Sequence, residues 1–253
     1  MNKTLNILTD NIKVKFTEIL GNNLTGIYLH GSVAFGCFNW ECSDIDFIAV
    51  VETEPDFDAK KKLIEFMLEI SKDAPAKGLE MSMVLAKDCK RVVYPVPYCL
   101  HFSEYHKKAY EADICSHIEK LQGTDKDLAA HFTVINHCGI TLCGKDKAEV
   151  FSPVPKEYYT DSIVFDVENA KDEIADNPVY IILNLCRVLA YIQDNKVLSK
   201  ADCQKWSYEH LPQYYQLIKK ATDCYIKAIN MEYDNNTLVF YADDMLKKIY
   251  ENL

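Results

Sequence analysis

Two carboxylates, Asp44 and Asp46, stand at the start of an apolar run in the segment HGSVAFGCFNWECSDIDFIAV (residues 30–50). Alternate residues of a β-strand point to the same side, with Cα atoms about 6.5–7 Å apart, so both carboxylates can reach one ion. Ile45 and Phe47 then face the opposite layer. Two carboxylates so close repel each other unless a cation lies between them, and Mg²⁺ prefers such oxygen ligands together with substrate phosphates. The spacing therefore predicts a magnesium site, with a tight turn capped by Asp44 as the structural alternative.

A Gly-Ser pair, Gly31 and Ser32, ends the preceding predicted strand. Glycine lets the backbone approach a phosphate closely, and N–H groups at the start of a following helix can bind the anion. Ser32 adds a hydroxyl donor. Together with the Asp-x-Asp that follows, the pair indicates a phosphate contact beside the metal.

A third carboxylate, Glu80, lies in the alternating segment GLEMSMVLA (residues 78–86). One face of this predicted strand is apolar and carries Leu79, Met81, Met83 and Leu85, whereas Glu80 shares the other face with Ser82 and Val84. If this strand lies beside the Asp-x-Asp strand, Glu80 points into the metal pocket. It would serve there as a further ligand or as a general base toward a substrate hydroxyl. The alternative is a solvent-exposed glutamate on an edge strand.

The elements that must position these residues form an α/β unit on a mixed sheet. Apolar residues at helical spacing predict helices, and short apolar or alternating runs predict strands. The predicted helices cover residues 5–20, 58–72 and 127–138, and the predicted strands lie within 24–32, 44–52, 78–86 and 97–105.

After the proline-containing segment FSPVP (residues 151–155), the pattern becomes helical throughout. Helices are predicted over 156–173, 179–193, 200–210, 214–231 and 235–252. We therefore expect two domains, residues 1–150 and 151–253.

Composition excludes several classes of protein. The 253 residues carry a net charge of −10, which argues against nucleic-acid binding. Ten cysteines are scattered along the chain, no apolar leader is seen, and no stretch approaches the roughly eighteen apolar residues of a membrane span. We expect a cytoplasmic monomer with reduced thiols that binds neither nucleic acid nor membrane.

Five segments give the sequence a family resemblance. GSVAFGCFNWECSDIDFIAV resembles the signature of the nucleotidyltransferase superfamily. The aminoglycoside adenylyltransferases that modify spectinomycin and streptomycin are resembled by GLEMSMVL, YPVPYCLHFSEY, GITLCGKDKAEVFSPVP and the block from NPVYIILNLCRVLAYIQDNKVLSK to LPQYYQLI. The resemblance covers nearly the whole chain. It implies an α+β fold, with a nucleotidyltransferase-type mixed sheet flanked by helices and an all-α C-terminal bundle. It also implies transfer of AMP from Mg·ATP to a hydroxyl of the antibiotic, which gives resistance.

Carried over residue by residue, the resemblance makes Asp44 and Asp46 ligands of Mg²⁺, one of two ions, and Glu80 the catalytic base that also faces the metal. Gly31 and Ser32 fall at the triphosphate, and Arg187 and Lys200 fall where the helical domain binds ATP. Arg187 lies in the apolar stretch IILNLCRVLAYI, so we expect an anionic partner, with a structural ion pair or a surface arginine as alternatives. Lys200 follows Ser199 in a predicted capping box with Asp202; a lysine there that merely points into water is the alternative.

Substrate contacts are expected at Glu104, Tyr105 and Glu173. Members acting on both drugs carry a tryptophan where this chain has Tyr105 and an aspartate near Glu173, so the departures favour spectinomycin over streptomycin. Exposed acids such as Asp172 and Asp176 are further candidates for contacts with substrate ammonium groups. Two other functions remain open: nucleotidyl transfer to a different small molecule or a protein, and a non-catalytic nucleotide-binding module.

Overall fold

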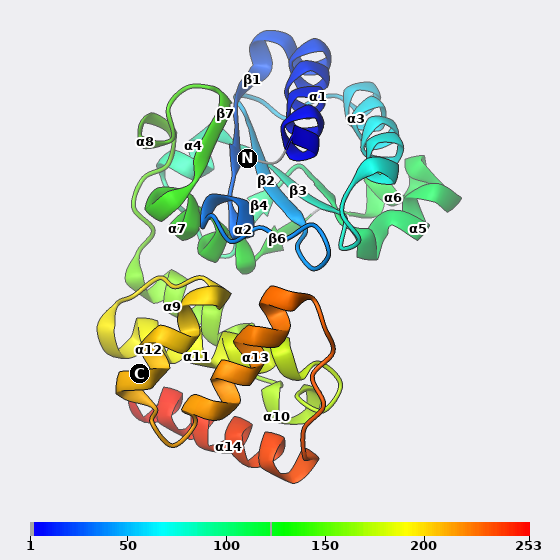
Figure 1. Cartoon of the computed structure of the whole chain (residues 1–253). Helices are drawn as coiled ribbons and strands as arrows, with labels where there is room; N and C mark the ends of the chain where they lie inside the picture. Colours follow the sequence, from blue (N-terminus) through cyan, green and yellow to red (C-terminus); the bar gives the residue numbers. More distant parts are fainter. Residues whose placement is uncertain (1–2, 122) are drawn as a thin grey trace. The chain divides into compact units, whose positions relative to one another are not determined.

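The computed structural model describes residues 3–121 and 123–253 (Figure 1). These residues group into two compact units, Met1–Tyr158 and Tyr159–Leu253. The domain boundary expected near residue 150 stays a prediction.

The first unit is built on a five-stranded mixed sheet with the strand order β5-β3-β2-β1-β7. β2 and β3 are parallel, whereas β1 pairs antiparallel with both β2 and β7, and β3 pairs antiparallel with β5. The strands of this sheet are β1 (Leu24–Leu29), β2 (Ile45–Val51), β3 (Leu79–Leu85), β5 (Leu100–Phe102) and β7 (Ile140–Gly144). A second, two-stranded sheet pairs β4 (Val96–Tyr98) with β6 (Gly123–Asp125).

Helices cover both faces of the larger sheet because its central strands are apolar on both sides. One face, which includes Ile45, Phe47 and Met81, packs with α1 (Lys3–Leu20) and α3 (Phe57–Ile70). The other face, which includes Ile48, Val50 and Val84, packs against Leu128, Phe132 and Ile135 of α7 (Asp127–Cys138). Successive side chains of β2 and β3 therefore point alternately into the two hydrophobic cores, one on each face of the sheet.

The remaining helices of this unit are short. They are α2 (Gly31–Ala34), α4 (Ala86–Lys90), α5 (Glu104–Ala112), α6 (Ile114–Lys120) and α8 (Lys147–Val150), with 3₁₀ turns at Gly21–Asn23 and Ser71–Asp73. The sequence pattern did not predict α5, α6 or the edge strand β7. β7 has no fully buried residue, and α5 has only one, Tyr110, so apolar periodicity is weak in both.

The second unit is helical. Its elements are α9 (Lys156–Phe165, which begins just before the unit boundary), α10 (Ala170–Glu173), α11 (Pro178–Asp194), η3 (Lys200–Asp202), α12 (Cys203–His210), α13 (Tyr215–Lys227) and α14 (Asn235–Glu251). The central helix α11 is surrounded by its neighbours and buries nine of its residues. Pro178 occupies its first turn, and Asn195 closes it in a left-handed conformation with φ 54°.

One predicted helix of this unit is wrong in extent. Residues 156–173 form two helices, α9 and α10, separated at 166–169. The predicted capping box is confirmed, since Ser199 and Asp202 exchange side-chain to backbone hydrogen bonds at the start of η3. Among the described residues, no helix combines the length and the apolar character that crossing a bilayer requires.

Candidate active site

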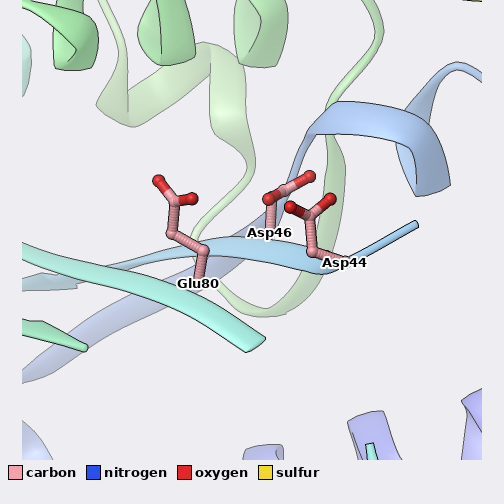
Figure 2. A group of neighbouring side chains, drawn as sticks. All are labelled: Asp44, Asp46 and Glu80. Carbon is pink, nitrogen blue, oxygen red and sulfur yellow. The ribbon is translucent and has the colours of Figure 1, made fainter. Parts of the chain in front are cut away.

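Three carboxylates converge at the start of the two parallel central strands (Figure 2). Asp44 directly precedes β2, Asp46 lies on β2, and Glu80 lies on β3. One oxygen of each lies within 4.8 Å of the corresponding oxygens of the other two. The structure therefore brings together all three acids selected from the sequence.

Strand register explains why Glu80 joins the pair. Asp46 and Glu80 are direct partners across β2 and β3, and neighbouring strands lie about 4.8 Å apart. Ile45 and Phe47, which flank Asp46, point into the opposite core as expected. Glu80 is partly buried in a central strand, so the alternative of an exposed edge-strand glutamate is wrong.

Gly31 is fixed beside Asp46 by close approach of the two chains. The His30 backbone N–H donates to the Asp46 carbonyl oxygen at 3.0 Å. Gly31 has φ +55°, and a β-carbon at this position would overlap the Asp46 carboxylate. Only glycine combines a positive φ with the absence of a β-carbon, so only glycine fits here without strain.

The neighbouring Ser32 presents an unusual hydroxyl. Its Oγ is buried and has no hydrogen-bond partner among the described residues. Buried polar groups are almost always hydrogen-bonded, so an orphaned hydroxyl beside a carboxylate cluster indicates a place for a ligand acceptor.

Electrostatics around Glu80 are unusual for a glutamate. Burial first, and then the charges of Asp44, Asp127 and Asp125, raise its pKa from 4.5 to about 7. Asp125 and Asp127, at β6 and the start of α7, were missed by the sequence analysis. The segment TDKD does repeat the Asp-x-Asp spacing, but nothing local to it indicates that it lies near Glu80.

The three carboxylates fit a hard divalent cation. Mg²⁺ takes oxygen ligands and is commonly bound by one or two carboxylates plus phosphate oxygens. A cation is favourable here because it compensates the repulsion between the acids, one of which, Glu80, has a pKa raised first by burial and then by neighbouring carboxylates.

The other candidate residues of this unit lie in α5. The Glu104 side chain packs against Gly78, two residues before Glu80, and accepts a hydrogen bond from Lys107 at 3.2 Å. Tyr105 is 89% exposed. Its ring contacts His106 and is otherwise open to solvent, and its contact with a substrate stays a prediction.

Arg187, Lys200 and Glu173 belong to the second unit. Arg187 is partly buried on α11; its Nε donates to the Leu198 carbonyl at 2.8 Å and its Nη1 to Asn184 Oδ1 at 3.0 Å. Among the described residues no carboxylate lies at ion-pair distance from it, so the alternative of a structural ion pair is wrong. Lys200 lies over the Tyr180 ring, 4.4 Å from its centroid, so the alternative of a lysine directed only into water is also wrong. Glu173 is exposed at the end of α10.

The first unit thus combines a mixed sheet, carboxylates on two neighbouring central strands and a Gly-Ser turn beside them. The fold class predicted from the sequence, with its helical C-terminal part, is confirmed by a solved structure that matches nearly the whole chain. This is a spectinomycin adenyltransferase from Enterococcus faecalis in complex with ATP and spectinomycin, with a TM-score of 0.82 and 20% identity over 97% of this chain and 99% of the other.

Two sequence comparisons agree with this fold. Residues 149–248 match the family model of the aminoglycoside adenylyltransferase C-terminal domain. A spectinomycin 9-adenylyltransferase of Enterococcus faecalis is 24% identical over 247 residues, which cover 94% of each chain. Residues 149–248 therefore match the aminoglycoside adenylyltransferases, and the comparisons bear out both the family resemblance and the enzyme class predicted from the sequence.

Proposed function

We propose that this protein transfers AMP from Mg·ATP to a hydroxyl of spectinomycin and so inactivates the antibiotic. The observation that carries the proposal is the convergence of Asp44, Asp46 and Glu80 within 4.8 Å. A protein with the same fold was solved with ATP and spectinomycin, which supports the choice of both substrates.

In the proposed reaction, Glu80 accepts the proton of the substrate hydroxyl. The hydroxyl oxygen forms a bond to the α-phosphorus of ATP while the bond from that phosphorus to the bridging oxygen breaks, and pyrophosphate leaves with the electron pair. A pKa of about 7 suits this role, because a base works best when its pKa is close to the working pH. Asp44 and Asp46 would hold Mg²⁺, which supplies positive charge for the phosphate oxygens when bound.

Four further residues are proposed to hold the triphosphate. Gly31 has no side chain, so its backbone can lie directly beside the Asp46 carboxylate. The orphaned Ser32 hydroxyl would donate a hydrogen bond to a phosphate oxygen. Arg187 and Lys200 would contribute positive charge from the second unit. The lack of a carboxylate partner for Arg187 among the described residues supports this, because a partly buried guanidinium is stabilised by an anion.

For the acceptor we propose spectinomycin rather than streptomycin. Glu104 and Glu173 are exposed acids able to bind substrate ammonium groups, and Tyr105 offers a flat exposed ring. A smaller ring than tryptophan at Tyr105 reduces the contact area for the larger drug, as expected from the family resemblance.

The test is to incubate the protein with Mg²⁺ and α-labelled ATP in three parallel reactions, containing spectinomycin, streptomycin or cell lysate. Mass spectrometry should detect AMP-spectinomycin in the first reaction and far less product in the second. Label incorporated only into a protein or another metabolite of the lysate would overturn the proposed acceptor. No transfer in any reaction would overturn the proposed activity.

A further inference from the structure

A hydrogen-bonded group in the second unit centres on Asp166, at the end of α9. Tyr180 donates its hydroxyl to Asp166 Oδ1 at 2.8 Å, and Asn184 donates its Nδ2 to Asp166 Oδ2 at 2.9 Å. Asn184 Oδ1 in turn accepts from Arg187 Nη1 at 3.0 Å. One carboxylate thus orients two neighbours, and one of these orients the guanidinium.

The second branch of the group reaches Lys200. The ammonium group of Lys200 lies over the Tyr180 ring, 4.4 Å from the centroid, which is the geometry of a cation–π contact. The hydroxyl of the same ring is held by Asp166. Both cations assigned to ATP are therefore connected to Asp166 through a single intermediate residue each.

Within the part of the chain that the structure describes, the hydrogen-bond acceptors of Arg187 are both neutral. The Leu198 carbonyl and the Asn184 amide oxygen take two of its five N–H donors, which leaves three for a ligand. A carboxylate in the position of the Asn184 amide would neutralise the guanidinium. Asn184 is only 3% exposed, so its amide is fixed and cannot exchange partners freely with water.

We propose that Asp166 and Asn184 are positioning residues that fix Arg187 and, through Tyr180, Lys200 for binding the ATP phosphates. This inference rests on the proposed function, because it needs ATP as the ligand. Neither residue touches the nucleotide in this account; Asp166 orients Asn184 and Tyr180, and these orient the cations. A guanidinium that is already fixed binds an anion better than a mobile one because less conformational freedom is lost on binding.

The test compares Asp166→Asn and Tyr180→Phe with the matched control Tyr214→Phe. Tyr214 also donates its hydroxyl to an aspartate of this unit, Asp244 Oδ2 at 2.7 Å, but it bonds no member of the Asp166 group. For each full-length variant, calorimetry gives the Kd of Mg·ATP and the Kd of spectinomycin, and thermal unfolding gives the Tm.

We expect Asp166→Asn and Tyr180→Phe to weaken Mg·ATP binding about tenfold, the loss typical of a hydrogen bond to a charged group. Spectinomycin binding should stay within about twofold of wild type. Tyr214→Phe should lower the Tm as much as Tyr180→Phe and leave the Kd of Mg·ATP unchanged.

Equal Mg·ATP affinity in Tyr180→Phe and Tyr214→Phe would overturn the inference. So would a parallel loss of affinity for both ligands, because that is the result of general destabilisation. If Asp166→Asn does not fold, the comparison of the Kd of Mg·ATP between Tyr180→Phe and Tyr214→Phe still tests the inference. Wild-type protein that binds Mg·ATP but modifies no acceptor contradicts only the proposed function, whereas wild-type protein that binds no Mg·ATP overturns both proposals.

Discussion

Asp46 of β2 and Glu80 of β3 are direct register partners in a parallel strand pair. Their side chains leave the sheet on the same face, and Asp44 reaches the same point from the loop that precedes β2. Because two central strands hold Asp46 and Glu80, their separation is set by strand spacing and not by loop conformation. Rigid elements of this kind are the supports that keep catalytic groups in place.

Removing the carboxylate of Glu80 should separate binding from chemistry. Glu80→Gln keeps the size and one oxygen of the side chain but cannot accept a proton, so transfer should fall by about 10²–10⁴-fold. The affinity for Mg·ATP should change little. Steady-state transfer to spectinomycin and calorimetry with ATP measure the two effects.

Glu104→Gln is the matched control, because Glu104 contacts Gly78 near the site and is exposed to solvent. Its transfer rate at saturating spectinomycin should stay close to that of wild type. Wild-type turnover in Glu80→Gln would contradict the assignment of Glu80 as the base.

Without divalent cations, the raised pKa of Glu80 should make stability depend on pH. Its folded-state pKa of about 7 exceeds the ordinary 4.5, so the folded state favours the protonated acid. The contribution to stability is complete below pH 4.5 and is lost as the pH rises through about 7.

Urea unfolding in EDTA at pH 5 and pH 8 measures this effect. Wild type should lose more stability than Glu80→Gln between the two values, by on the order of 2 kcal/mol. Added Mg²⁺ should reduce the difference, since a cation favours the ionised carboxylate. The same pH dependence in both proteins would show that Glu80 is not desolvated as described.

Gly31→Ala should strain the backbone and, in addition, displace the Asp46 carboxylate. Gly21 offers the matched control: its φ is +51° against +55° for Gly31, but a β-carbon there meets nothing within 4 Å. Both substitutions carry the same left-handed strain, about 1–2 kcal/mol. Only Gly31→Ala displaces Asp46, so only that variant should lose Mg²⁺-dependent transfer, which a rate titration with MgCl₂ measures. Equal Mg²⁺-dependent transfer in the Gly31→Ala and Gly21→Ala variants would contradict the claim that the site needs the close approach of Gly31 to Asp46.

Enlarging the ring at Tyr105 should change which antibiotic is accepted. Tyr105 is 89% exposed, so Tyr105→Trp should leave the Tm within about 1 °C of wild type. The larger ring should improve kcat/KM for streptomycin while the value for spectinomycin changes little. Competition assays with both drugs measure the ratio, and an unchanged ratio would contradict the role given to this position.

Much of the first unit could be predicted from local pattern because its strands are strongly apolar. The run from Ile45 to Val51 and the alternation from Leu79 to Leu85 identify β2 and β3. That these strands are neighbours, with Asp46 and Glu80 in register, is a tertiary pairing that the sequence analysis could state only as a condition. The missed edge strand Ile140–Gly144 is stabilised by pairing with β1. Its residues are at most partly buried, so the strand shows no clear alternation of apolar and polar residues.

The residues missed around the sites are those brought in by tertiary structure. Asp125 and Asp127 reach Glu80 from more than forty positions away in sequence, so no local spacing relates them. The predicted helix over 156–173 breaks after Phe165 without a proline or glycine. At the break, the Asp166 carboxylate bonds Tyr180 and Asn184 of α11, an interaction that helical periodicity does not reveal.

The most direct test of the account is the position of a bound divalent cation. Crystals grown with ATP and Mn²⁺, which replaces Mg²⁺ and scatters anomalously, should show an anomalous peak at about 2.0–2.3 Å from oxygens of Asp44 and Asp46, on the side that Glu80 faces. Crystals of the Asp46→Asn variant, grown in the same way, should lack that anomalous peak. A Mn²⁺ peak bound to ATP but away from these carboxylates, or a Glu80 side chain turned to the other side of the sheet, would contradict the account.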